Sequence, residues 1–314
     1  LGMDETDLSI IIVNWNTCDL LRACIRSILA NSEQLRIEIL VIDNNSSDGS
    51  VSMMQREFPD IYLIANQENH GFARANNQGL ELAKGRCLFL LNPDTVIQPQ
   101  ALTRLVTFLD THPGAGAVAA KLLNTDLSLQ YSVRHFPNYL TPFTENSTLF
   151  NAPVISRFSR SSHLMTWDHE SISEVDQPAG AAFMIKRAVI ETLGMLDDAY
   201  HMFFEDVDLC YRITSNGWKI FYLPEARIVH HGGQSVKQRQ NVGEEFYRSL
   251  IRFFRVHFGI WSERRIRVFM LIGSASLIAY SATLTLFNPS RAYHLAKTSL
   301  GVFRCALARE KSAA

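Results

Sequence analysis

Apolar runs and amphipathic stretches alternate along the first 120 residues of the chain. Each apolar run has the length of a buried strand, and each amphipathic stretch has a helical period. The runs predict strands over Leu8–Val13, Ile37–Ile42, Ile61–Ala65, Arg86–Leu91 and Ala115–Ala120. The stretches between them predict helices over Asp19–Ala30, a short segment ending near Phe58, Gly71–Lys84 and Pro99–Asp110. Strands that alternate with helices favour a doubly wound, parallel α/β sheet.

The pattern changes after this alternation. Residues 121–175 are polar, rich in Ser and Asn and weakly periodic, so we expect a long excursion over the sheet. Regular structure then resumes, with Gly180–Lys186, strands over Lys219–Tyr222 and Ala226–Val229, and helices over Arg187–Leu193 and Phe203–Asn216. An amphipathic helix rich in aromatic residues is predicted over Glu244–Phe258.

The C-terminal part has the composition of a membrane-associated segment. Residues 248–267 contain six arginines and one acid, and the next 20 residues, Val268–Phe287, carry no charge. That stretch just reaches transmembrane length, and its Ser and Thr content makes it marginal. A single span from the cytosol would export the basic residues that follow it, against the positive-inside tendency. We therefore expect a re-entrant or in-plane segment whose arginines meet anionic lipid. The alternative is a buried helix that closes the domain or forms a homodimer contact.

Bulk composition narrows the classes of partner. The 314-residue chain has a formal net charge of −1, so no nucleic-acid partner is expected. Its five cysteines form no C-x-x-C pair, which disfavours a disulfide framework or zinc site and favours a reducing cytosol. The N-terminal residues lack a basic region and an apolar region, so they are not expected to be a signal peptide.

Polar residues follow three predicted strands at the point where each strand ends. They are Asn14 and Asn16, then Asp43, Asn44 and Asn45, then Asn92 and Asp94. Turn and cap preferences of Asn and Asp explain any single cluster. Three clusters on one edge of one sheet favour a shared ligand site, and the acid after the second strand suits a base or ribose. The chain has no G-x-G-x-x-G or G-x-x-x-x-G-K-[ST] motif, which disfavours Rossmann dehydrogenases and P-loop enzymes.

The stretch "NHGFARANNQG", Asn69–Gly79, places Phe72, Asn76 and Gly79 on one helical face. An interior Gly costs about 1 kcal/mol relative to Ala, and an inward Asn needs hydrogen-bond partners. A polar ligand or a close backbone would explain both, and Arg74 suits a phosphate or a base. The alternative is a tightly packed helix with a satisfied Asn.

Two later motifs carry titratable groups. In "FFEDVDLCYR", Glu205 and Asp206 lie in a first helical turn, where the helix dipole favours acids, and Asp208 is spaced to pair with Arg212. Asp206 shares a face with apolar residues, where a carboxylate with a raised pKa can act as a general base. In "IVHHGGQS", His230 and His231 end a predicted strand, and a neutral imidazole with a carboxylate can complete a divalent-metal site.

As an ordered set, these motifs resemble family 2 glycosyltransferases, which have the GT-A fold, a Rossmann-like, mostly parallel sheet flanked by helices. The matching segments are "SIIIVNWN", "VIDNNSSDGS", "NHGFARANNQG", "LFLLNPDT", "GAAFMIKR", "FFEDVDLCYR" and "VHHGGQS". The resemblance implies a transferase domain over residues 7–257, with a nucleotide-binding half over 7–120 and an acceptor half over 121–257. Residues 258–314 would then form a helical, membrane-associated tail. The "LLNPDT" form is most similar to the rhamnosyltransferase branch.

The resemblance also implies roles for individual residues. The catalytic base would be Asp206, with Glu205 and Asp208 orienting the acceptor. The nucleotide sugar would be bound by Asn14, Asn16, Asp43, Asn45, Gly71, Arg74, Asn76 and Asn92. Asp94 and His230 would hold Mg²⁺ or Mn²⁺ on the diphosphate. "NPD" occupies the position of the D-x-D motif of the family, and Asn92 replaces its first carboxylate, so Asp94 must be helped by His230.

The function that the resemblance implies is an inverting transfer of a sugar, with L-rhamnose from dTDP-rhamnose as the first choice. The acceptor would be a hydroxyl of a glycan or a lipid-linked saccharide in cell-surface polysaccharide synthesis, at the inner face of the membrane. A sugar nucleotidyltransferase is an alternative, although the expected Gly-rich activation loop is missing. A non-catalytic membrane scaffold is a second alternative, which intact Asp94, Asp206 and His230 disfavour.

Overall fold

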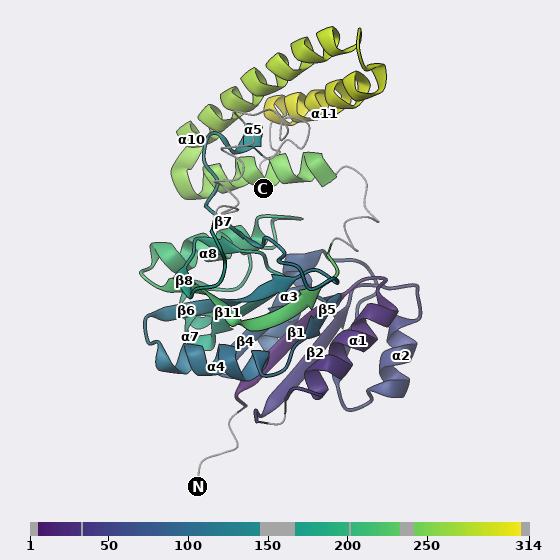
Figure 1. Cartoon of the computed structure of the whole chain (residues 1–314), viewed down its shortest axis with the longest axis vertical. Coiled ribbons are helices and arrows are strands. Elements are labelled where there is room, and N and C mark those ends of the chain that lie inside the picture. The colour runs from purple at the N-terminus through teal and green to yellow at the C-terminus, as the bar shows by residue number, and fades with distance from the viewer. Residues whose placement is uncertain (1–5, 33, 145–166, 201, 233–241, 309–314) are drawn as a thin grey trace. The chain divides into compact units, whose positions relative to one another are not determined.

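The computed structural model describes residues 6–32, 34–144, 167–200, 202–232 and 242–308 (Figure 1). These residues form two compact units. The first contains residues 6–136, 167–200 and 205–232, and the second contains residues 137–144, 202–204 and 242–308. Much of the expected polar excursion, residues 145–166, lies outside the described residues.

The first unit is built on a nine-stranded sheet. Its strands are β1 (Leu8–Asn14), β2 (Ile37–Asp43), β3 (Tyr62–Ala65), β4 (Cys87–Leu91), β5 (Thr95–Ile97), β6 (Ala115–Leu123), β8 (Ser173–Glu174), β10 (Ala182–Lys186) and β11 (Lys219–His230). The order is β3-β2-β1-β4-β10-β6-β11-β5, and β8 also pairs with β11. A separate two-stranded sheet pairs β7 (Val133–Arg134) with β9 (Gln177–Pro178).

The sheet is mixed: it contains the parallel strands that the prediction expected as the larger part of the sheet, and antiparallel strands beside them. β10 runs antiparallel between β4 and β6, and β5 and β8 run antiparallel to β11. The remaining neighbours are parallel. The prediction came from β-α alternation, which ends at residue 120, and β10 enters the sheet from beyond that point.

Helices cover both faces of this sheet (Figure 1). They are α1 (Cys18–Leu29), α2 (Ser50–Glu57), α3 (Phe72–Leu82), α4 (Ala101–Thr111), α7 (Arg187–Leu193) and α8 (Glu205–Ser215). One core cluster joins α1, α2 and α4 to alternate strand positions such as Ile10 and Ile12. The other joins α3, α7 and α8 to the intervening positions, such as Ile11. Burial on both faces explains why the central strands are apolar without interruption.

Three details of the predicted elements are wrong. The two strands expected over Lys219–Tyr222 and Ala226–Val229 are the single strand β11, which crosses Pro224 by a register shift between Leu223 and Arg227. Proline has no N–H for the ladder, so the pattern indicated a break where the structure has a bulge. The short strand β5 was not expected, and α4 begins at Ala101 rather than at Pro99.

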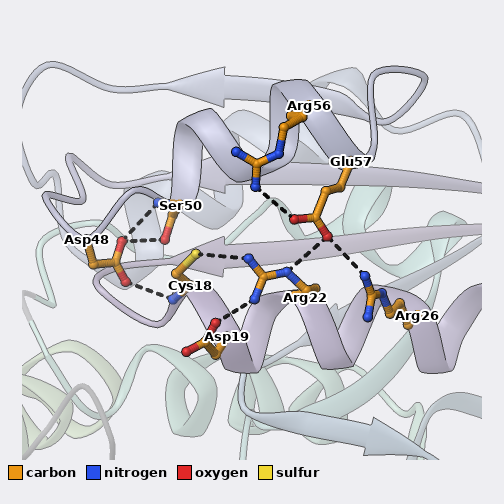
Figure 2. Close-up of polar contacts among 8 residues, drawn as sticks. All are labelled: Cys18, Asp19, Arg22, Arg26, Asp48, Ser50, Arg56 and Glu57. Atoms are coloured by element: carbon orange, nitrogen blue, oxygen red, sulfur yellow. Dashed lines mark hydrogen bonds and ion pairs between the residues drawn. The ribbon is translucent and has the colours of Figure 1, made fainter.

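The loop after β2 is tied to the start of α1 (Figure 2). The Asp48 carboxylate accepts hydrogen bonds from the Cys18 N–H at 2.7 Å and from the Ser50 hydroxyl at 2.6 Å. Further along α1 and α2, the Glu57 carboxylate is contacted by three guanidinium groups, those of Arg22, Arg26 and Arg56. These contacts hold the "DNNSSDGS" loop in place at the carboxyl edge of the sheet.

The second unit consists of α5 (Thr141–Thr144), α10 (Val242–Leu284) and α11 (Pro289–Leu307). α10 is interrupted at Gly259, whose φ of 80° and ψ of 176° are accessible almost only to glycine. α11 turns back along α10, and the Arg267 guanidinium donates to the carbonyls of Cys305, Ala306 and Ala308 at its C-terminus. The segment after Gly259 and α11 therefore form an antiparallel helical hairpin.

The Gly79→Ala substitution tests how closely α3 packs on the sheet. A Cβ atom at Gly79 would lie 2.5 Å from Ile11 Cγ2 and 2.9 Å from Ile42 Cδ1. The crowding should lower the free energy of unfolding by about 1–3 kcal/mol, despite the helix-propensity gain of ~1 kcal/mol. Denaturant unfolding measures the change. Gly114→Ala is the matched control, because nothing lies within 4 Å of its Cβ position, and equal midpoints for the two variants would refute the packing argument.

Candidate active site

The ends of β1 and β2 carry the first polar pair. Asn14 and Asp43 are register partners on these parallel strands, and both are buried. Asn14 Nδ2 donates to Asp43 Oδ2 at 2.8 Å, and the Ser46 N–H donates to Asp43 Oδ1 at 2.8 Å. A carboxylate has about four acceptor positions, so Asp43 keeps acceptor capacity for a ligand donor. Asn14 therefore orients the Asp43 carboxylate.

The neighbouring loop is held by the amide of Asn44, which the sequence placed in the polar cluster after the second strand without an individual role. Asn44 is buried, and its Nδ2 donates to Asn69 Oδ1 and to the Gly71 carbonyl, each at 3.1 Å. Its Oδ1 accepts the His70 N–H at 3.2 Å. Gly71 itself has a φ of 84°, in the region that favours glycine. Asn44 therefore shapes the turn that enters α3.

The residues predicted around α3 differ in their exposure. Arg74 is exposed and free to reach a ligand, whereas Asn76 is buried and donates to the Phe72 carbonyl at 2.9 Å. Together with the packing of Gly79, this contact favours the interpretation of a tightly packed helix for Asn76.

Asn16 and Asn45, in the turns that follow β1 and β2, both have left-handed backbones, with φ of 53° and 66°. The Asn16 Oδ1 atom accepts the Ser47 N–H at 2.8 Å.

The "NPD" turn is held by hydrogen bonds on both sides. The Asn92 N–H donates to the Ala181 carbonyl at 2.9 Å, just before β10, and the Thr95 hydroxyl donates to the Asn92 carbonyl at 2.7 Å. β5 follows at once and pairs with the end of β11, with Thr95 opposite His230. This pairing places His230 Nε2 3.3 Å from Asp94 Oδ1, and Asp94 is only 5% exposed. The two side chains are close enough to share an ion.

The donor set at this point suits a hard divalent cation that keeps other ligands. Asp94 offers a carboxylate oxygen and His230 an imidazole nitrogen, a combination compatible with Mn²⁺ or Mg²⁺. Within the described part of the chain, no group of three or more His, Cys, Asp or Glu side chains could hold a metal by itself. The remaining ligands would have to be water and ligand phosphate oxygens.

A further residue, missed in the sequence, contacts His230 on its other side. Gln130 Oε1 lies 2.6 Å from His230 Nδ1, and Gln130 Nε2 donates to the His230 carbonyl at 3.1 Å. Gln130 lies in the weakly patterned 121–175 stretch, where nothing in the residue order distinguishes it from its neighbours. Only the return of that segment toward β11 indicates its place.

Asp206 is joined to the carboxyl edge of the sheet through the segment that precedes β10. It is the second residue of α8, and its Oδ2 accepts the Gly180 N–H at 3.0 Å while its Oδ1 accepts the Val207 N–H at 2.8 Å. Gly180 precedes Ala181, the partner of Asn92, so Asp206 and the "NPD" turn are linked through one short segment. Burial raises the pKa of the Asp206 carboxyl, although these two hydrogen bonds and the charge of Arg134 oppose the rise.

The two flanking acids are buried. The Asp208 carboxylate accepts Arg212 Nε at 2.8 Å, and the same guanidinium donates to the carbonyls of Leu193, Gly194 and Met195. Asp208 thus anchors the loop over residues 193–195. Glu205, 8% exposed, begins α8 directly after Phe203 and Phe204, whose φ values of 63° and 71° are strained for aromatic residues. Backbone strain of this kind clusters at functional sites.

Comparison with known sequences agrees with the family resemblance that the motifs carry. The family described as "Glycosyl transferase family 2" matches residues 9–193. The N-acetylglucosaminyl-diphospho-decaprenol L-rhamnosyltransferase of Mycobacterium tuberculosis is 24% identical over 214 residues, which cover 63% of this chain and 68% of that protein.

Two solved structures have a similar fold. The mannosyltransferase PcManGT from Pyrobaculum calidifontis, in complex with GDP-Man and Mn²⁺, is 17% identical with a TM-score of 0.55, over 96% of this chain and 86% of that one. GalNAc-T7 with UDP, GalNAc and Mn²⁺ is 17% identical with a TM-score of 0.59. That match covers 81% of this chain and 48% of GalNAc-T7, so this chain spans about half of it. The expected GT-A fold is confirmed.

Asp206→Asn should change stability in a pH-dependent way. The pKa of Asp206 is raised in the folded protein, so ionising it is costlier there than in the unfolded chain. The cost is absent at pH values below the ordinary carboxyl pKa of 3.8 and complete above the raised pKa. The free energy of unfolding of the variant, relative to wild type, should therefore rise as the pH increases from 3.8 toward 7, because the variant lacks the cost of ionisation.

Urea unfolding at several pH values measures this difference. Asp48→Asn is the control of opposite sign: burial raises the pKa of Asp48, but hydrogen bonds from Ser50 and Cys18 outweigh it and lower the pKa. Asp48→Asn should be less stable than wild type at neutral pH, and less so in acid. An Asp206→Asn variant that behaves in the same way would contradict the raised pKa.

Proposed function

The chain belongs to glycosyl transferase family 2, and we propose that it transfers a sugar from a nucleotide-sugar donor to an acceptor hydroxyl with inversion at the anomeric carbon. Our choice of donor is dTDP-L-rhamnose, supported by the resemblance to the rhamnosyltransferase branch and by the name of the mycobacterial relative. The acceptor is a lipid-linked saccharide or glycan of the cell surface. The same relative supports this choice, because its name describes a sugar diphosphate on a polyprenol.

The observation that carries this proposal is the 3.3 Å approach of His230 to Asp94 beside the "NPD" turn. A divalent cation held by these two residues would stabilise the negative charge that grows on the departing nucleoside diphosphate. Asn92, at the place of the first carboxylate of the D-x-D motif, presents an amide that can donate to a phosphate oxygen. Both similar structures contain Mn²⁺, which makes it the first ion to test.

Nucleotide recognition is assigned to the β1–β2 edge and to the start of α3. Asp43, oriented by Asn14, accepts from the base, and Asn16 and Asn45 line the adjacent turn. Gly71 lets the backbone approach the nucleotide, and exposed Arg74 meets a phosphate or stacks on the base. Asn76 contributes by holding the first turn of α3, because its side chain is bonded within the helix.

Asp206 is assigned as the general base. Proton abstraction from the acceptor hydroxyl needs a carboxylate that is ionised yet basic, and burial raises the pKa of Asp206 toward that range. Gly180 fixes the carboxylate through Oδ2. Glu205 orients the acceptor from the preceding position, and Asp208 acts indirectly through Arg212 and the loop 193–195.

The helical hairpin of the second unit supports attachment to the cytoplasmic face of a membrane. Among the described residues, one helix, Gly243–Leu284, is long and apolar enough to cross a membrane by length and composition. α11 returns along it to Arg267, however, so both ends of the hairpin lie at the same end of the pair. A re-entrant hairpin returns Arg304, near the end of α11, to the side where the apolar segment began, in agreement with the positive-inside tendency.

Exposure and hydrogen bonding in the hairpin fit partial insertion into lipid. Val268, Ile272 and Tyr280 are exposed on one face of α10, and Leu286 and Phe287 at the turn are 83% and 85% exposed. Four hydroxyls in this region already donate to carbonyls of the same chain segment, those of Ser276, Ser281, Thr283 and Thr285. Polar groups that are satisfied in this way are tolerated in lipid.

The opposite end of the hairpin is charged. Trp261 is 68% exposed with the Arg264 guanidinium 4.8 Å from its ring centroid, and Arg265 is exposed beside it. Trp and Arg together are typical of the headgroup level of an anionic membrane. The turn at Leu286 and Phe287 is therefore the end that enters the lipid.

The catalytic proposal is tested by a donor screen with dTDP-rhamnose, UDP-sugars, GDP-sugars and other dTDP-sugars, each with and without Mn²⁺. Turnover should require the ion, and Asp206→Asn should lower kcat by about 10²- to 10⁴-fold with donor binding retained. Asp94→Asn should instead weaken binding of the ion, and excess Mn²⁺ should partly restore turnover. Full activity of Asp206→Asn would refute the base assignment, and pyrophosphate release from a sugar phosphate and a nucleoside triphosphate would identify a nucleotidyltransferase.

Membrane attachment is tested by flotation with vesicles of phosphatidylglycerol and phosphatidylcholine. Leu286→Ser with Phe287→Ser should lower partitioning at least about tenfold, since each buried side chain contributes ~2 kcal/mol. Leu29→Ser with Tyr62→Ser, at positions 47% and 54% exposed in the first unit, is the matched control. If the turn instead forms a homodimer contact, the two substitutions would leave flotation unchanged and would convert a dimer to a monomer in sedimentation.

A further inference from the structure

We propose that Gln130 is a positioning residue that holds His230 in the tautomer with its proton on Nδ1, so that the Nε2 lone pair faces Asp94. The inference rests on the proposed metal-assisted transfer, in which His230 ligates the cation through Nε2. It concerns a residue that the family resemblance did not single out. The argument depends on which end of the Gln130 amide faces the imidazole ring.

The orientation of the Gln130 amide is determined by two acceptors. Its nitrogen lies 3.0 Å from Asn124 Oδ1 and 3.1 Å from the His230 carbonyl oxygen. A carbonyl oxygen only accepts, so the atom near it must be the NH₂ group. The reversed amide would place its oxygen against that carbonyl oxygen. Gln130 Oε1 therefore faces the ring, 2.6 Å from His230 Nδ1.

This orientation selects the state of the ring. An amide oxygen has no proton to donate, so Nδ1 must be the protonated nitrogen of a neutral imidazole. Nε2 then carries the lone pair. Asn92 Nδ2, a donor, lies 3.4 Å from Nε2, a contact at the long end of the hydrogen-bond range that suits an acceptor at this position.

Asp94 lies on the Nε2 side of the ring. Nε2 is 3.3 Å from Asp94 Oδ1, and both side chains are largely buried, at 12% and 7% exposure. An unprotonated Nε2 and a carboxylate oxygen repel unless a cation lies between them. A histidine whose second ring nitrogen is held by an acceptor is the usual arrangement at metal centres, since it orients the ring and raises the basicity of the ligand.

The contact is built by elements distant in sequence. Gln130 follows the turn after β6, where its N–H donates to the Leu122 carbonyl at 3.0 Å. It meets the end of β11 100 residues later. Gln130 thus forms hydrogen bonds with both the backbone and the ring of His230. These two contacts keep Nε2 of the ring on the side of Asp94.

The ring state is measured by ¹⁵N NMR of the full chain labelled at histidine, in the absence of metal, at a pH where the His230 shifts are those of a neutral ring. The signal is assigned by its loss in His230→Asn. Wild type should show a protonated Nδ1 and an unprotonated Nε2. Gln130→Met, similar in length and without the acceptor, should show a mixture of tautomers.

The link to the ion is measured separately by Mn²⁺ binding, followed by electron paramagnetic resonance. Gln130→Met should lower the affinity for Mn²⁺ by about 10- to 100-fold, the usual effect of losing the hydrogen-bond partner of a metal-bound histidine. Gln177→Met is the matched control, because Gln177 Nε2 donates to the His135 carbonyl at 2.8 Å without that glutamine being assigned to the site. It should leave both readouts unchanged.

The outcomes separate this inference from the proposed function. A proton on Nε2 in wild type, or a Gln130→Met variant with unaltered tautomer and Mn²⁺ affinity, would overturn the role of Gln130. Wild type with the expected tautomer but no Mn²⁺ binding would support the positioning contact and overturn the metal site. Loss of Mn²⁺ affinity in Gln130→Met and in Gln177→Met alike would indicate general destabilisation and also overturn the specific role.

Discussion

The pairing of β11 with β5 is the constraint on which the candidate site depends. β11 runs parallel to β6 for most of its length, and its last residues run antiparallel to β5. A one-residue slip in that register would turn His230 to the other face of the sheet, away from Asp94. The bulge at Pro224 lies upstream of this contact. The relative position of Asp94 and His230 is therefore determined by a backbone ladder and refined by side chains.

The second determinant is the short segment before β10, which carries the base assignment. Gly180 donates to Asp206, and Ala181 accepts from Asn92, so two neighbouring peptide groups set the spacing between the assigned base and the "NPD" turn. A Cβ at Gly180 would lie 3.2 Å from both Cβ and Oδ2 of Asp206, which explains why the smallest residue stands there. Burial that raises the pKa of Asp206 also makes its ionised form costly to the fold, a trade-off that is common where function needs a destabilised group.

The two units follow different physical rules. The first buries apolar strands between helices on both faces, and its surface turns carry the polar chemistry. The second is a helix interrupted at Gly259 and a returning helix, with exposed Leu286 and Phe287 beside Arg291 at the turn, and exposed Arg264 and Arg265 at the other end. An apolar face left open to water destabilises a soluble protein but is stabilised in contact with lipid.

The sequence by itself determined the strands of the first half, their helices and the polar clusters at one sheet edge, because apolar periodicity and the rule for parallel strand ends are local properties. It also indicated that Asp94 needs a partner. Tertiary structure decided the mixed sheet, the internal bonding of Asn76, the approach of His230 to Asn92 across 138 residues and the place of Gln130. These depend on strand register and on the return of a weakly patterned segment, and no local residue pattern encodes either.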